Sequence, residues 1–137
     1  MSAVFRTRTR PIGFADTDMA GIVHFSRFFI LMEEVEQEFL RSRGLSVIFA
    51  EDDVTYGLPR VSAHCDFERP VFFEDVLDAK LWIERLGEKS ITYAVEFSKD
   101  DQVVAVGRIT ACCILHGQKP LAPRPLPPRV RAILERE

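Results

Sequence analysis

The feature that most constrains the fold is one long amphipathic helical pattern. It runs from about His24 to Arg43, and Gly44 follows as the left-handed residue that commonly ends a helix. The apolar stripe consists of Phe25, Phe28, Phe29, Met32, Val35 and Phe39. Off the stripe lie Glu33, Glu34, Gln37 and Glu38, whereas Glu36 falls roughly 50° from its centre. A helix with so apolar a face needs another element to cover it.

Strand-like segments on both sides of this helix supply that cover. They are predicted at 4–13, 60–69, 76–86, 89–99 and 102–115. In 89–99 apolar and polar residues alternate, and "KDDQ" at 99–102 predicts a hairpin turn. The last strand is almost continuously apolar, so we expect both of its faces to be buried. The order predicts an α+β fold, a long central helix wrapped by a five-stranded antiparallel sheet whose last four strands form a meander.

The segment 118–137 is Pro-rich and then helical, with Pro128 near the helix start. Its "PRPLPP" also fits the pattern of a ligand for SH3 domains. We favour a stiff segment that delivers a short terminal helix onto the surface. Residues 1–137 are therefore expected to form a single domain. In 4–13, arginines alternate with Phe and Thr, which favours a strand over a transit peptide.

Composition excludes several classes of function. With 137 residues, 47% of them hydrophobic, and a net charge of −3, the chain predicts one soluble domain without a general attraction to nucleic acid or to anionic membranes. No apolar stretch approaches the ~20 residues that span a bilayer. The three cysteines, Cys65, Cys112 and Cys113, show no disulfide or metal-ligand spacing. Reduced, buried thiols and a cytoplasmic location fit best.

Most common catalytic motifs are absent from the sequence. It contains no Gly-rich phosphate loop, no G-x-S-x-G and no H-E-x-x-H. His64 and Cys65 are neighbours on a predicted strand, so their side chains point to opposite faces and cannot act as base and nucleophile together. We therefore expect neither a metal site nor a bound cofactor.

The stretch "FADTDMAGIVHF" places Asp16 and Asp18 just ahead of the predicted helix. Two interpretations fit. The acids can form a solvated turn that complements the helix dipole. Alternatively, unpaired N–H groups at the helix start polarise a carbonyl while a neighbouring carboxylate attacks it or deprotonates a water. The apolar "GIVHFSRFF" that follows is unusual for a solvated loop, and it favours the second interpretation.

Longer motifs carry a resemblance to a known family. "D-T-D-x-A-G-I-V-H-F", a long helix with "F-F-I-L-M-E-E", and then "D-F-E-R-P-V-F-F-E-D" occur in this order over essentially the whole chain. This order resembles the 4-hydroxybenzoyl-CoA thioesterase family of hotdog-fold acyl-CoA hydrolases. The resemblance implies a hotdog fold and a reaction that converts acyl-CoA to free acid and CoA.

The resemblance also implies roles for individual residues. Asp18 matches the catalytic carboxylate, and Gly21 matches a glycine that lets the backbone pass close to the thioester. Phe25 matches the position whose backbone N–H is aimed at the thioester oxygen, and we expect the neighbouring N–H of His24 to help polarise the thioester. Asp16 matches an acid that has no direct chemical role. Glu33 matches a common helix glutamate without an assigned role.

The resemblance further implies an assembly in which two chains join their sheets and the active site lies between subunits. We expect a homodimer at minimum and a homotetramer as the fuller assembly. Lys89 and Ser90 match a Lys-Ser pair that contacts CoA, and Arg85 is proposed as a further CoA contact because it is nearby. Gly87 and Glu88 stand where some relatives carry arginines. Leu58 replaces a hydroxyl residue near the substrate ring.

The substrate is predicted to be an acyl-CoA with some preference for aromatic acyl groups. Phe25, Phe28 and Phe29 suit stacking against a ring. The His24–Phe25 pair after "GIV" resembles the branch that acts on 1,4-dihydroxy-2-naphthoyl-CoA, and His24 is a candidate partner for a ring hydroxyl. Acyl groups on acyl carrier protein, short or medium aliphatic acyl-CoA, and a non-catalytic acyl-CoA-binding module remain alternatives.

Overall fold

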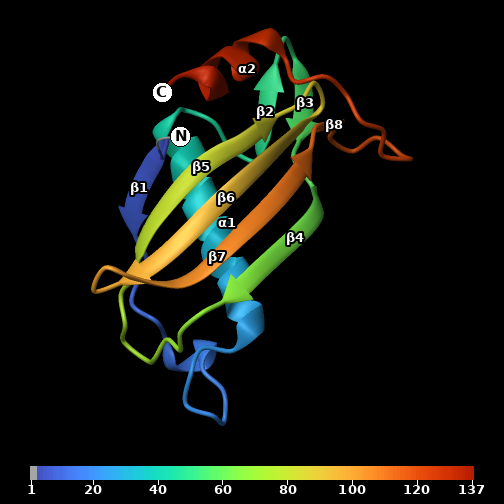
Figure 1. Cartoon of the computed structure of the whole chain (residues 1–137). Coiled ribbons are helices and arrows are strands. Elements are labelled where there is room, and N and C mark those ends of the chain that lie inside the picture. Colours follow the sequence, from blue (N-terminus) through green and yellow to red (C-terminus); the bar gives the residue numbers. More distant parts are fainter. Residues whose placement is uncertain (1–2) are drawn as a thin grey trace.

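A long helix crosses one face of a twisted antiparallel sheet in the computed structural model, which describes residues 3–137 (Figure 1). The helix α1 spans Phe25–Ser42, close to the predicted 24–43, and Gly44 adopts the expected left-handed conformation with φ 74°. The strands of the sheet are β1 (Phe5–Arg8), β4 (Arg60–Phe67), β5 (Asp78–Leu86), β6 (Ser90–Lys99) and β7 (Gln102–Cys112). The predicted α+β hotdog architecture is confirmed.

The core lies between α1 and the inner face of the sheet. Alternation in β6 buries four side chains completely, namely Ile91, Tyr93, Val95 and Phe97. They belong to the same core as Phe28, Met32, Val35 and Phe39 from the apolar stripe of α1, which Leu31 joins although it is not part of the predicted stripe. Gly107 of β7 allows the close approach, since a Cβ there would lie 2.2 Å from Sδ of Met32. The sequence pattern thus produces the packing expected from it.

The order of the strands corrects one prediction. Their sequence in the sheet is β1-β5-β6-β7-β4, so β4 pairs with β7 and not with β5. The predicted four-strand meander is therefore wrong, because the connection from β4, at one edge of the sheet, passes β7 and β6 before the chain enters β5, next to β1. On its way it passes the start of α1, where the N–H of Val23 donates to the carbonyl of Val71 (2.8 Å).

A second sheet was not predicted. It contains β2 (Ile48–Glu51), β3 (Val54–Gly57) and β8 (Ile114–Leu115). The predicted strand 102–115 is divided at Cys113, and its last residues join this small sheet. In β7 only one face is buried and Arg108 is exposed, so the expected burial of both faces is wrong. All three cysteines are free, but only Cys113 is buried.

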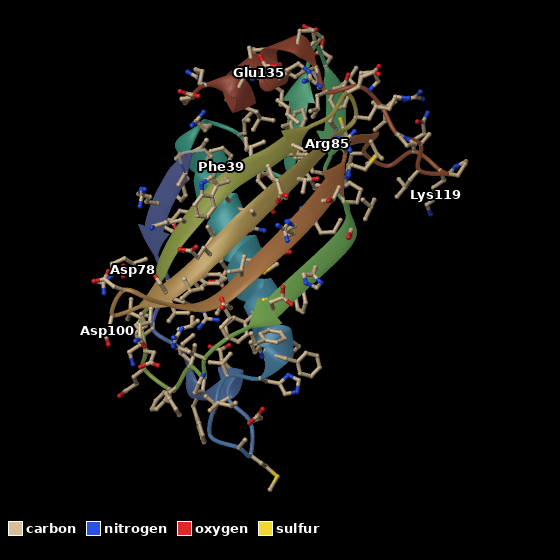
Figure 2. The ribbon with its side chains drawn as sticks, viewed as in Figure 1. Phe39, Asp78, Arg85, Asp100, Lys119 and Glu135 are labelled. Atoms are coloured by element: carbon tan, nitrogen blue, oxygen red, sulfur yellow. The ribbon has the colours of Figure 1, made fainter. Side chains whose placement is uncertain are left out.

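The N-terminal segment forms an edge strand of the sheet, and the C-terminal helix covers one end of the molecule. The strand predicted over 4–13 is limited to the four residues of β1, whereas the predicted C-terminal helix forms as α2 (Pro128–Glu135). Helix α2 contributes Val130 and Leu134 to the core, at the end of the sheet near Arg85 (Figures 1 and 2). Within residues 3–137, no helix is long and apolar enough to cross a membrane.

Candidate active site

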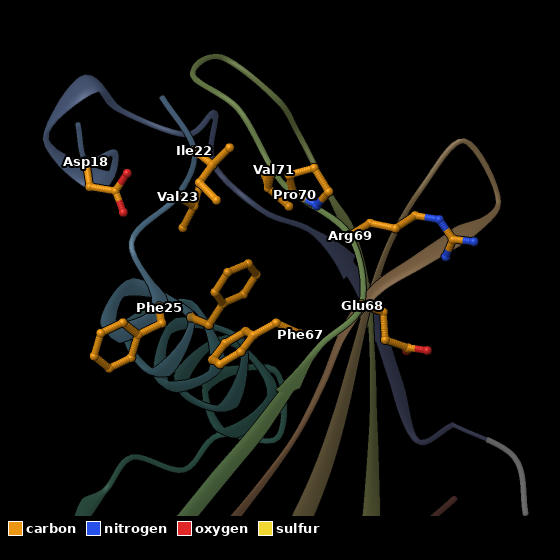
Figure 3. A pocket seen from close by; sticks show the side chains of 10 residues that line it. Asp18, Ile22, Val23, Phe25, Phe67, Glu68, Arg69, Pro70 and Val71 are labelled. Atoms are coloured by element: carbon orange, nitrogen blue, oxygen red, sulfur yellow. The ribbon is translucent and has the colours of Figure 1, made fainter. Parts of the chain in front are cut away.

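A pocket of about 420 Å³ opens where α1 begins, and two segments distant in sequence form its walls (Figure 3). One wall comes from the segment that leads into α1 and from its first turn; the other comes from the end of β4 and the residues after it. The lining residues are Asp18, Ile22, Val23, Phe25, Phe28, Phe67, Glu68, Arg69, Pro70 and Val71. The charged ends of Glu68 and Arg69 point away from the other wall. The interior is therefore mainly apolar.

Aromatic rings form much of this surface. Phe28 lies 5.2 Å from the ring of Phe67, in a tilted arrangement that favours the contact. Phe25 lies at the mouth, with 61% of its surface exposed. Phe29, which sequence reasoning assigned to the acyl pocket, is not among the lining residues and packs against the core. Phe67 takes that place from the opposite wall.

Asp18 sits on a tight turn at the rim of the pocket. The N–H of Gly21 donates to the Asp18 carbonyl (2.9 Å), and Gly21 has φ 81°, a conformation that favours glycine. Gly21 itself does not line the pocket. Oδ1 of Asp18 accepts from the N–H of Ala20 (2.8 Å), whereas Oδ2 has no hydrogen-bond partner within residues 3–137. The carboxylate is exposed and directed toward the space between the walls (Figure 3).

Asp16, two residues earlier, has the opposite environment. Its side chain is buried and accepts hydrogen bonds from Arg10 (2.6 and 3.2 Å) and from the N–H of Gly13 (2.8 Å). Arg27 on α1 lies 3.9 Å away. The hydrogen bonds from Arg10, which outweigh the effect of burial, hold the pKa of the Asp16 carboxyl below its usual value. This carboxylate is fully engaged by protein groups and lies outside the pocket lining.

The start of α1 offers one free donor rather than two. The N–H of His24 donates to the carbonyl of Asp16 (2.8 Å), so it cannot polarise a substrate carbonyl, contrary to expectation. The N–H of Phe25 has no hydrogen-bond partner within residues 3–137, as expected in the first turn of a helix. The His24 ring caps the helix by accepting from the N–H of Ser26 (3.3 Å) and lies 4.5 Å from the Phe25 ring. It does not line the pocket.

The residues expected to contact CoA lie at the other end of the sheet. Ser90 pairs with Cys112 of β7, whereas Phe67 pairs with Ala105. Seven residues separate these two positions on β7, which corresponds to roughly 23 Å along a strand. Arg85 and Lys89 are exposed near Ser90, and Figure 2 places Arg85 at the end remote from the β6–β7 turn. A single chain therefore does not bring these residues to Asp18.

A second buried carboxylate occupies the middle of α1. Glu36 is fully buried and contacts Arg60 of β4, and its Oε2 has no hydrogen-bond partner among the described residues. Burial raises the pKa of Glu36 to about 7, although the charge of Arg60 acts in the opposite direction. Glu33 is exposed and lies 3.8 Å from Arg60. Within residues 3–137, no group of His, Cys, Asp or Glu side chains is arranged to hold a metal ion.

The sequence predicts the wall of the pocket that carries Asp18, Phe25 and Phe28, but not the wall formed by the end of β4 and the residues after it. The segment from Phe67 to Val71 was noted only as the motif "DFERPV", without a role. That motif was the available signal, because an apolar strand end followed by proline has to leave the sheet near its end. The contact of Arg60 with Glu36 was not predicted, because the partner of a buried helix carboxylate depends on which strand packs across the helix.

A long helix wrapped by a five-stranded antiparallel sheet is the architecture of the hotdog class of proteins, and in this chain an acid-bearing turn lies where the helix begins. Comparison with known families gives the more specific assignment. Residues 12–134 match the thioesterase-like superfamily, and the chain belongs to that family of thioester hydrolases. The resemblance drawn from the sequence motifs is thereby confirmed.

Individual relatives are similar over most of their length. A 1,4-dihydroxy-2-naphthoyl-CoA hydrolase of Prochlorococcus marinus (strain MIT 9313) is 36% identical over 103 residues, which cover 70% of this chain and 68% of that protein. The crystal structure of a 1,4-dihydroxy-2-naphthoyl-CoA thioesterase from Synechocystis superposes with a TM-score of 0.80 at 26% identity, covering 95% of this chain and 94% of the other. A gentisyl-coenzyme A thioesterase superposes with a TM-score of 0.81 at 29% identity, covering 95% and 99%.

Proposed function

We propose that this protein hydrolyses acyl-CoA thioesters to a free acid and CoA at the pocket beside Asp18. The observation that carries the proposal is the arrangement at the pocket mouth. There an exposed carboxylate and the unpaired N–H of Phe25 flank an apolar cavity. The relatives named as hydrolases or thioesterases of CoA esters support the same activity.

The chemistry follows from these two groups. The N–H of Phe25 donates to the thioester oxygen and stabilises the negative charge that develops on it. Asp18 either deprotonates a water that attacks the carbonyl carbon or attacks that carbon itself to give an anhydride, which water then opens. In both routes the C–S bond breaks. In the first route the CoA sulfur takes the proton that Asp18 removed from the water; in the second it leaves as a thiolate, which takes a proton from solvent. The free oxygen of Asp18 suits either role.

The acyl group would occupy the space between the two apolar walls. Phe25, Phe28 and Phe67 present ring faces and edges that suit an aromatic acyl group, because offset and tilted ring pairs are favourable. Relatives that act on dihydroxynaphthoyl-CoA and gentisyl-CoA are consistent with this preference. His24 is not part of this proposal, since its ring nitrogen caps the helix and the side chain lies outside the pocket lining.

Binding of the CoA portion requires a second chain in this proposal. The edge strand β4 pairs only with β7, so its outer hydrogen-bonding groups remain available, and Val61 and Phe67 are exposed along it. Antiparallel pairing of two copies of β4 would place the Arg60 end of one copy beside the Phe67 end of the other. Lys89, Ser90 and Arg85 of one chain could then serve the pocket of its partner.

Two experiments test the proposal. Release of thiol is measured for 1,4-dihydroxy-2-naphthoyl-CoA, benzoyl-CoA, butyryl-CoA and palmitoyl-CoA. We expect hydrolysis with kcat/KM highest for an aromatic substrate. A tenfold lead for an aliphatic one, worth about 1.4 kcal/mol, would overturn the aromatic preference, and no thiol release from any would overturn the activity. Light scattering at micromolar concentration should give a dimer or a tetramer, and a monomer would contradict the shared site.

A further inference from the structure

Asp16 is placed so that each of its polar groups holds a different part of the candidate site. Its carboxylate binds Arg10, which follows β1, and lies near Arg27 in the first turn of α1. Its backbone carbonyl accepts the N–H of His24, the residue directly before Phe25. Its backbone N–H donates to Gly13 (3.0 Å) and closes the short 3-10 turn that Asp16 ends.

These contacts surround the two groups that the proposed reaction uses. Asp18 follows Asp16 by two residues, and a bridge between Thr17 and Val23 closes the turn that carries Asp18. The N–H of Phe25 is one residue beyond the N–H that Asp16 binds. The segment 16–24 thus begins at Asp16, and its last residue, His24, is hydrogen-bonded to the Asp16 carbonyl. Asp16 therefore fixes the distance between Asp18 and the N–H of Phe25.

The arrangement also explains why a carboxylate stands at a buried position. Arg10 reaches from Asp16 to Glu34 of α1 (3.3 Å), so one guanidinium ties the turn to the helix. Three N–H donors, two from Arg10 and one from Gly13, point at the two side-chain oxygens of residue 16. An ionised aspartate can accept all three hydrogen bonds, whereas a neutral asparagine has only one acceptor oxygen and can accept only some of them. Without the negative charge, Arg10 and Arg27 would lose their common partner.

We propose that Asp16 is a positioning residue, which holds Asp18 and the N–H of Phe25 in register for hydrolysis without touching the substrate. This inference rests on the proposed function. Its consequence is kinetic: displacing the turn by a fraction of an ångström lowers the rate of the chemical step, whereas the aromatic lining from the first turn of α1 and the end of β4 (Phe25, Phe28 and Phe67) stays in place to bind the acyl group.

The test compares Asp16→Asn with a matched control, Asp75→Asn. Asp75 also accepts from a cationic side chain at 2.6 Å (Lys99) and from a backbone N–H at 2.8 Å (Phe72), and it does not line the pocket. We expect Asp16→Asn to lower kcat on the order of tenfold with KM within twofold. Asp75→Asn should keep kcat within twofold. If Asp16→Asn folds poorly, Arg10→Gln removes the two guanidinium bonds to Asp16, together with the contact to Glu34, and should also lower kcat.

A double-mutant cycle separates positioning from an independent effect. In the Asp18→Asn background, Asp16→Asn should cause clearly less than a tenfold further loss, because one of the two groups that it positions is already gone and only the Phe25 N–H remains to be displaced. An equal tenfold loss in both backgrounds, or a kcat for Asp16→Asn as high as that of the control, would overturn the inference. A wild-type protein without thioesterase activity, or a fully active Asp18→Asn, would instead overturn the proposed function.

Discussion

Helix α2 covers one end of the five-stranded sheet (Figure 1), whereas the opposite end carries an open pocket (Figure 3). At the covered end Leu126, Val130 and Leu134 are buried, and Arg43 donates to the carbonyls of Ile133 (2.9 Å) and Arg136 (2.8 Å). At the open end several large apolar side chains are exposed: Phe14, Met19, Phe25, Phe67, Phe72 and Phe73.

The difference shows how one small fold separates stability from reactivity. At the covered end, the guanidinium of Arg43 is hydrogen-bonded to the C-terminal segment and holds it in place. At the open end, the N–H of Phe25 and one oxygen of Asp18 have no partner within residues 3–137. The neighbouring Asp16 is instead bound by Arg10. Exposed apolar surface of this kind marks a binding site more often than it stabilises a fold. Substitutions at the two ends should therefore change different properties.

The largest effect is expected at the open end. Asp18→Asn should lower kcat on the order of 10²–10⁴-fold, the scale of a lost general base or nucleophile, while the unfolding transition stays unchanged. Steady-state kinetics and urea unfolding of the same preparation measure both. Asp16→Asn serves as the comparison and should cost much less. Equal losses in the two variants would contradict the separate roles assigned to the two acids.

The reverse pattern is expected at the covered end. Leu134→Ala should destabilise the protein by about 2–5 kcal/mol, because it removes a buried side chain from under α2 and leaves a cavity. The kcat of the folded fraction should stay within twofold of wild type. Urea unfolding and thiol release at saturating substrate measure the two quantities. A large drop in kcat at full folding would show that the two ends are not separable.

The middle of α1 belongs to neither end and adds a dependence on pH. Because the pKa of Glu36 is raised to about 7 in the folded protein, this group stabilises the fold most below its unfolded pKa near 4.5. That stabilisation is lost as the pH rises through 7 and falls by about 2 kcal/mol between pH 5.5 and 8. In Glu36→Gln this decline should be absent. Urea unfolding at both pH values measures it, and an equal slope in both proteins would contradict the assignment.

The smallest effect is expected from the exposed cation near Ser90. Lys89→Ala should raise KM for acyl-CoA about fivefold, as for the loss of an exposed ionic contact of about 1 kcal/mol, with kcat unchanged. Lys119→Ala, another exposed lysine on the Pro-rich segment, is the control and should leave KM unchanged. An unchanged KM for Lys89→Ala would remove this residue from the proposed CoA site.

Local patterns in the sequence determined the elements that the chain uses. The apolar stripe and Gly44 predicted α1 nearly to its ends, and alternation predicted β6, because helix and strand periodicity are properties of neighbouring residues. The position of Asp18 ahead of the helix was also evident, and motif resemblance identified the family. The roles of Asp18, Phe25, Lys89, Ser90 and Arg85 remain predictions for experiment.

Only the tertiary structure decided which segments meet. The pairing of β4 with β7, the small sheet of β2, β3 and β8, and Phe67 in the pocket in place of Phe29 all depend on contacts between residues far apart in the chain. The same holds for the two acids of "ADTD". They lie two residues apart in the sequence. In the fold, Arg10 and the N–H of Gly13 bind both oxygens of Asp16, whereas one oxygen of Asp18 has no partner within residues 3–137. Hydrogen-bond partners are assigned by geometry in space, which spacing along the chain does not specify.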